Sequence, residues 1–242
     1  MINMGEDLRR ACAVVFVVIL AATVSPGLSA KDKLPEVSDD GLHLQKDTKA
    51  AAVYLKPGAT LDQYEKIALL DCFVSFKKNW QRDYNRDEMG LERRVSDDDV
   101  TAMKKRVADE FKVVFTNELD TKGGYAIVDH AAADVLVLRP AIINLVVDAP
   151  DTMSPGMDRT FVASAGQMTL YLELYDSVTS DIIARIIDPE ADRGMGIAQM
   201  GNRVTNKAAA DRIMKRWADT LRGHLDAVRK AASETKTAPT DS

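Results

Sequence analysis

The feature that most constrains the fold is a regular alternation of apolar and polar side chains between residues 167 and 188. Methionine and leucine occupy every second position of residues 168–174, with threonine, tyrosine or glutamate between them. This period of two is typical of a β-strand with one buried face. A polar turn at residues 176–180 follows, and the alternation resumes over residues 182–186. The pattern predicts a β-hairpin, which we interpret as structural scaffold.

Two helices and a fully buried strand are predicted around this hairpin. Ser96 can cap a helix whose apolar side chains recur at steps of three and four through residues 100–115. A second helix opens at Thr205 and carries a similar stripe over residues 213–228. Residues 134–147 are apolar on both faces, which is typical of a strand in the middle of a sheet. The sequence therefore predicts an α+β fold, with a mixed, mainly antiparallel sheet and two long helices packed on one face.

Three local segments carry weaker patterns. The apolar run of residues 67–76 is expected to form one strand. Pro140 is expected to cause a bulge or bend in the buried strand, because proline cannot donate to a ladder. The densely charged segment 77–94 mixes acids and bases, and we interpret it as a solvated loop with Trp80 folded back on the domain.

The first residues have the layout of a secretory signal peptide. A pair of arginines precedes an apolar run over residues 11–24, and small residues follow it. The run of about 14 residues is shorter than the ~20 that cross a bilayer. Cleavage is expected after Ala30, and Lys31 stands where a lipid-anchored protein would have cysteine. We therefore expect a periplasmic or secreted protein with no lipid anchor and no integral membrane span after signal removal.

The predicted organisation of the chain has four parts. Residues 1–30 form the signal peptide, 31–49 an extended lead-in, 50–232 a single α+β domain, and 233–242 a disordered tail. The chain has a formal net charge of −5 with both signs interspersed, so no basic surface for nucleic acid is expected. Cys72 follows the signal peptide as the remaining cysteine. We expect it to be a buried, inert thiol that forms no intramolecular disulfide.

No recognised catalytic or metal-binding motif is present in the sequence. The three histidines, His43, His130 and His224, have no partner at zinc-ligand spacing, and there is no phosphate-binding loop or nucleophile elbow. We therefore expect a non-catalytic protein with no catalytic residues, no cofactor and no metal. The alternative is a periplasmic hydrolase whose site is assembled from distant acids and His130.

Two segments rich in proline, glycine and aspartate, residues 148–157 and 189–202, flank the hairpin and its approach. The methionines in these segments are Met153, Met157, Met195 and Met200. Such flexible apolar side chains suit partner binding, and together with Trp80 they form the predicted working surface of a binding module. The expected partner is another envelope protein or the membrane surface. Thioethers also suit Cu(I), so soft-metal binding through the methionine cluster is a further alternative.

Three stretches carry structural motifs that are found together in one family. The first contains Val53-Tyr54-Leu55-Lys56-Pro57-Gly58-Ala59 and Phe76-Lys77-Lys78-Asn79-Trp80, the second is the turn Asp176-Ser177-Val178-Thr179-Ser180, and the third runs from Trp217 to Asp226. They resemble an exported bacterial family known as the domain of unknown function numbered thirty-three thirteen. Ser180 replaces the glycine of the family's turn. The resemblance implies an envelope protein, of a kind that often carries the lipid anchor missing here, and it implies no catalytic residues.

Overall fold

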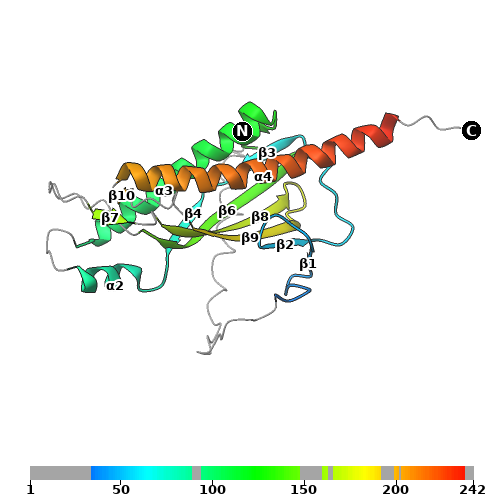
Figure 1. Cartoon of the computed structure of the whole chain (residues 1–242). Coiled ribbons are helices and arrows are strands. Elements are labelled where there is room, and N and C mark those ends of the chain that lie inside the picture. The colour runs from blue at the N-terminus through cyan, green and yellow to red at the C-terminus, as the bar shows by residue number, and fades with distance from the viewer. Residues whose placement is uncertain are drawn as a thin grey trace, which may run out of the picture. The chain divides into compact units, whose positions relative to one another are not determined.

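The computed structural model of the chain contains a central eight-stranded mixed sheet (Figure 1). The structure describes residues 34–88, 94–147, 160–162, 166–191, 199–201 and 203–237, and the predicted signal peptide lies outside them. The strands follow the spatial order β1-β2-β9-β8-β6-β3-β5, and β4 also pairs with β6. Their bounds are β1 His43–Leu44, β2 Ala52–Leu55, β3 Lys66–Leu69, β4 Phe73–Phe76, β5 Ala126–Ile127, β6 Val135–Val146, β8 Gln167–Asp176 and β9 Ile182–Ala191. Two further strands, β7 Thr160–Val162 and β10 Gln199–Gly201, form a separate antiparallel pair.

The predicted hairpin is formed by β8 and β9. Leu172 lies opposite Ile186 and Leu174 opposite Ala184, so these four side chains share one face of the sheet. On the other side of β8 lies β6, the strand that is apolar on both faces. β6 has neighbours on both sides, as the sequence predicts for a central strand.

The turn between β8 and β9 is closed by the side chain of Asp176. Its Oδ1 atom accepts hydrogen bonds from the backbone N–H groups of Val178 at 2.9 Å and Thr179 at 2.7 Å. These bonds hold the pKa of the Asp176 carboxyl below its ordinary value, because they favour the ionised form. Ser180 has a φ of +60°, a left-handed conformation that glycine adopts more easily.

The two long helices are also formed as predicted. Helix α3, Asp97–Thr116, begins with a capping box: the Asp99 N–H donates to Ser96 Oγ at 3.1 Å, and the Ser96 N–H donates to Asp99 Oδ2 at 2.9 Å. The chain continues as the π-helix η2, Asn117–Lys122. Helix α4, Arg203–Thr237, extends into residues 233–237, which were predicted to belong to a disordered tail.

Both long helices cover one face of the sheet and contact each other (Figure 1). The largest side chains that the helices contribute to the shared core are Phe111, Phe115, Met214 and Trp217. The fold class is therefore confirmed as α+β, with four antiparallel and three parallel strand pairs in the main sheet. Among the described helices, none combines the length and the hydropathy needed to cross a membrane.

The opposite face of the sheet is partly covered by residues 35–44. Leu42 is buried against Tyr54 and Ala52 of β2, and the Tyr54 hydroxyl donates to the Pro35 carbonyl at 3.1 Å. Strand β1, which belongs to the predicted lead-in, pairs with β2 at the edge of the sheet.

The prediction of one strand over residues 67–76 is wrong, because the chain leaves the sheet between Leu69 and Phe73. The resulting strands β3 and β4 both run parallel to β6, one after the other. Pro140 lies on β6 beside this gap, where its missing N–H needs no partner. Of the predicted bulge or bend at Pro140, the bulge is absent: the register between β6 and β8 is continuous there and shifts between Ile143 and Val146.

The charged segment after β4 is not the loop that its composition suggests. Trp80–Asp87 form helix α2, in which Trp80 is 8% exposed. The Trp80 ring stacks on Phe76 of β4, with 4.3 Å between the ring centroids, and on Tyr84 one helical turn away at 5.9 Å. Two aromatic side chains at positions i and i+4 give this short helix an apolar side that packs on the end of the sheet.

Candidate functional site

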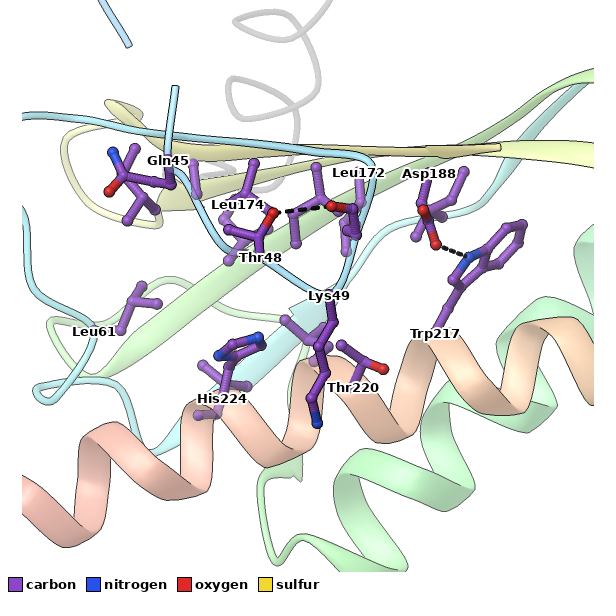
Figure 2. Close-up of a pocket in the computed structure, with 18 of the residues that line it drawn as sticks. Gln45, Thr48, Lys49, Leu61, Leu172, Leu174, Asp188, Trp217, Thr220 and His224 are labelled. Carbon is purple, nitrogen blue, oxygen red and sulfur yellow. Dashed lines mark hydrogen bonds between the residues drawn. The ribbon is translucent and has the colours of Figure 1, made fainter. Parts of the chain in front are cut away.

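A groove of about 590 Å³ lies between α4 and the sheet, along β2, β9 and β8 (Figure 2). Most of its lining is aliphatic. The aliphatic side chains of this lining include Leu172, Leu174, Ile186, Leu221, Leu225 and Val228. The loop of residues 45–50, between β1 and β2, forms its third wall. This loop is called the 45–50 loop below.

The apolar character of the groove follows from the periods of the elements around it. Every second residue of β8 and β9 points toward α4. Val53 of β2 pairs with Ile186 of β9, so it lies on the same face. On α4, Trp217, Leu221 and Leu225 recur at steps of four and therefore face the sheet together. These patterns were found in the sequence, where they predict ordinary core packing.

The groove has buried residues on its sheet side and exposed residues in the 45–50 loop. Leu172 and Leu174 on the sheet are each only 1% exposed, whereas Lys46 and Lys49 of the loop are exposed. Figure 2 shows Lys49 of the loop extending toward α4, where Thr220 and His224 lie. The free space is therefore located between the loop and α4, with an apolar interior and a polar mouth.

The carboxylates of the groove are held by partners within it. Asp188 on β9 accepts a hydrogen bond from the Trp217 Nε1–H at 2.8 Å and a second from the Ala51 N–H at 2.9 Å. Glu190 forms an ion pair with Arg216 of α4, with 2.6 Å between Oε2 and Nη2. Neither acid is therefore free to act as an isolated general base.

The mouth of the groove carries exposed basic side chains. Lys46 and Lys49 belong to the 45–50 loop, and both contribute to the lining. Within the part of the chain that the structure describes, neither lysine forms an ion pair. The Thr48 hydroxyl donates to the Ala50 carbonyl at 2.9 Å, which fixes the backbone turn between the loop and β2. The mouth thus presents positive charge above an apolar interior.

A second, more open pocket of about 360 Å³ lies at the turn end of the hairpin. Its polar groups bond to one another: the Tyr64 hydroxyl donates to Asp176 Oδ2 at 2.9 Å, and Lys56 pairs with Asp181 at 2.8 Å. Burial and the hydrogen bond to Asp176 raise the pKa of Tyr64 to about 12. A tyrosine in this state is a poor proton acceptor or donor near neutral pH, so Tyr64 is not a candidate for acid–base chemistry in this pocket.

The structure does not bring the predicted working surface into one described site. Trp80, the first residue of α2, is buried and stacks on Phe76, so its ring is part of the scaffold. Three of the four methionines, Met153, Met157 and Met195, lie outside the described residues. Met200 belongs to β10, opposite Phe161 of β7. Partner binding by these methionines and copper binding through them stay predictions.

The other predicted chemical groups lie apart from the groove. His130 is exposed, and its Nδ1 atom is 3.7 Å from Asp129 Oδ1, which is too long for the hydrogen bond that the hydrolase hypothesis requires. Cys72 is half-buried in the gap between β3 and β4, and burial raises its pKa to about 12. A thiol with that pKa carries almost no thiolate at neutral pH, in agreement with the expected inert role.

Sequence reasoning missed the groove and its mouth. Its apolar residues were found, but as core positions, since a sequence does not show the distance between a helix and a sheet. Lys46 and Lys49 stand in a polar loop with no motif. The sequence signal that could have indicated the polar mouth of the groove was His224, a polar residue beside the apolar stripe of the last helix.

Comparisons with solved structures give distant similarities. The PelC dodecamer from Paraburkholderia phytofirmans is similar with a TM-score of 0.36 and 12% identity, over 69% of this chain and 96% of that one. The "putative neuraminyllactose-binding hemagglutinin homolog" from Helicobacter pylori is similar with a TM-score of 0.39 and 13% identity, over 73% and 92%. The chain matches none of the curated proteins.

One comparison covers most of the domain. The family model described as "Protein of unknown function (DUF3313)" matches residues 36–221. These residues extend from the segment that covers the open face of the sheet to the middle of α4, and they include the groove's strands and its 45–50 loop. The chain therefore belongs to the DUF3313 family.

Proposed function

We propose that this protein is a non-catalytic binding module of the cell envelope, whose ligand site is the groove between α4 and the sheet. The expected ligand is an elongated apolar molecule or an apolar part of a larger one. The location is supported by the sequence pattern of the first residues, which is typical of an exported protein.

The observation that carries this proposal is the apolar lining of a groove of about 590 Å³. Small-molecule sites usually measure about 300–1,000 Å³ and combine a mostly apolar lining with a few polar groups. Covering apolar surface contributes about 25 cal/mol for each Å² removed from water, so an apolar ligand is favoured there. The two acids in the lining, Asp188 and Glu190, would disfavour an apolar ligand if they were unpaired. They are bonded to Trp217, Ala51 and Arg216.

The arrangement of charged groups favours binding over catalysis. Asp188 accepts two hydrogen bonds, one at each carboxylate oxygen, so both oxygens already have a donor within the fold. Among the described residues, no group of three or more His, Cys, Asp or Glu is arranged to hold a metal ion. A ligand can cover the apolar surface of the groove, while the acids of the groove are bonded to neighbouring protein groups.

The proposal is tested with the neutral fluorescent probe N-phenylnaphthylamine, whose emission rises in apolar surroundings. Thr220 lines the groove from α4 and is half-buried, so Thr220→Trp places a large side chain in the open space without removing a core residue. We expect this substitution to weaken probe binding by at least about tenfold, because the groove loses its free volume.

The matched control is Lys215→Trp, an exposed position on the same helix outside the groove. It should leave probe affinity and melting temperature unchanged. If the purified protein does not bind the probe, or if both tryptophan variants bind it equally well, the groove is not the ligand site.

A further inference from the structure

The length of the groove suits an elongated molecule. Its lining on α4 extends from Arg216 to Val228, which corresponds to about 18 Å along the helix axis at 1.5 Å per residue. The aliphatic side chains of Leu172 and Leu174 lie on the sheet side of this lining. An apolar space of this length accommodates an extended alkyl chain.

The charges around the groove are unevenly distributed. Its acids, Asp188 and Glu190, lie on β9 and are bonded to Trp217, Ala51 and Arg216. Lys46 and Lys49 lie at the mouth on the opposite wall, and within the described residues neither has an ion-pair partner. Asp47 stands between them in the sequence but does not line the groove. The mouth is thus locally positive on a chain whose net charge is −5.

The long side chains of the two lysines suit this position. A lysine side chain lays its aliphatic stem along apolar surface and keeps its ammonium group in water. Figure 2 shows Lys49 extending from the loop toward α4, near Thr220. An anionic group located there would contact the ammonium groups, while the attached alkyl chain occupies the interior. His224, exposed on the facing helix, adds a second polar wall to the mouth.

From this arrangement we infer that the ligand is an amphiphile with one alkyl chain and an anionic head group, which Lys46 and Lys49 hold at the mouth. This inference rests on the proposed function and adds the chemical class of the ligand. A neutral apolar molecule would fill the interior without using the lysines, and a cationic amphiphile would be repelled by them.

The test compares three amphiphiles of equal chain length, laurate, lauryl alcohol and laurylamine, by displacement of N-phenylnaphthylamine from the purified protein. Laurate should bind about tenfold more tightly than lauryl alcohol, and laurylamine more weakly than either. Raising the salt concentration should reduce the advantage of laurate, because exposed charges are screened.

The double variant Lys46→Glu/Lys49→Glu should weaken laurate binding by about tenfold, leave lauryl alcohol unchanged and strengthen laurylamine. Lys46→Arg/Lys49→Arg should retain laurate affinity. The matched control, Lys77→Glu/Lys78→Glu, reverses two exposed lysines outside the groove and should change none of the three affinities.

The outcomes of these measurements distinguish the inferred anionic head group from the proposed apolar ligand site. Equal affinity of the wild-type protein for laurate and lauryl alcohol would overturn the head-group inference and leave the proposed apolar site intact. The same holds if the glutamate variant weakens both ligands alike. Failure of the probe and of all three amphiphiles to bind would overturn both claims.

Discussion

The Trp217 indole N–H donates to Asp188 Oδ2 across 2.8 Å, and this bond joins α4 to β9 at one end of the groove. The second oxygen of Asp188 accepts from the backbone N–H of Ala51 at 2.9 Å, directly before β2. One carboxylate therefore connects the helix, the hairpin and the residue that joins the 45–50 loop to β2. We infer that Asp188 helps to hold these walls of the groove together.

Replacement of Asp188 by alanine should reduce the free energy of unfolding by about 1–3 kcal/mol, because it leaves the indole N–H and the Ala51 N–H without their acceptor. Urea unfolding monitored by circular dichroism measures this loss. The emission of Trp217 should also shift, because its indole loses a hydrogen bond. Asp181→Ala on the same hairpin removes an exposed pair with Lys56 and should cost less than about 1 kcal/mol. Equal losses in the two variants would contradict the connecting role of Asp188.

Glu173 should be the most sensitive acid on the face of the sheet away from the long helices. It is buried and accepts hydrogen bonds from Tyr175 at 2.8 Å, Tyr171 at 3.2 Å and Arg185 Nη2 at 2.9 Å. Glu173→Ala leaves the Tyr171 and Tyr175 hydroxyls without this acceptor, while Arg185 keeps its ion pair with Asp40, and we expect a loss of about 1–3 kcal/mol in the free energy of unfolding. Arg139→Ala removes a more exposed partner at 3.5 Å and should cost less than about 1 kcal/mol.

Asp40 should make stability depend on pH in the acid range. Arg185 donates hydrogen bonds to its carboxylate, which holds the pKa of Asp40 below its ordinary value. A lowered folded-state pKa means that the unfolded chain binds the proton more readily. The stabilisation is therefore fully present above about pH 4 and is lost as the pH falls through the folded pKa. The melting temperature of Asp40→Asn should be below that of the wild type near neutral pH and should approach it near about pH 2. Asp39→Asn, at the adjacent exposed residue, should show no such convergence.

Ser180→Gly should stabilise the protein by up to about 1 kcal/mol, because Ser180 has a φ of +60° and glycine adopts that conformation without a steric cost. The change is measured as a rise in melting temperature. Ser177→Gly in the same turn should have the opposite sign, since the Ser177 hydroxyl donates to the Ala132 carbonyl at 2.7 Å and accepts from its N–H at 3.1 Å. If both glycines destabilise the turn, the strain assigned to Ser180 is absent.

The elements with a strong hydrophobic period could be predicted from the sequence. The hairpin and the helices α3 and α4 have apolar side chains at regular intervals, and β6 is a continuous apolar run, so these elements are visible without coordinates. The cap at Ser96 was also predicted, because a serine hydroxyl can accept from the first turn of a helix, and the structure adds the reciprocal bond from the Ser96 N–H to Asp99.

The features that could not be predicted have one physical cause in common. A local sequence pattern does not define which other segments surround a residue in the fold. Leu70 and Cys72 are as apolar as their neighbours, so the gap between β3 and β4 has no signature in composition. In α2, the aromatic pair Trp80 and Tyr84 was hidden among charges. The groove depends on the separation between α4 and the sheet. No single residue encodes that distance.

The position of β2 has a consequence for how the chain folds. Val53 of β2 pairs with Ile186 of β9, and the other neighbour of β2 is the two-residue strand β1. The edge of the sheet near the N-terminus therefore cannot be completed until the hairpin has been synthesised. Contacts between such distant segments slow folding and leave strand edges open to wrong partners in the meantime. A ribosome-bound chain that stops before β9 should therefore have a protease-sensitive β2 and should bind chaperones. Protease sensitivity and chaperone binding should both decrease once residue 191 has emerged from the ribosome.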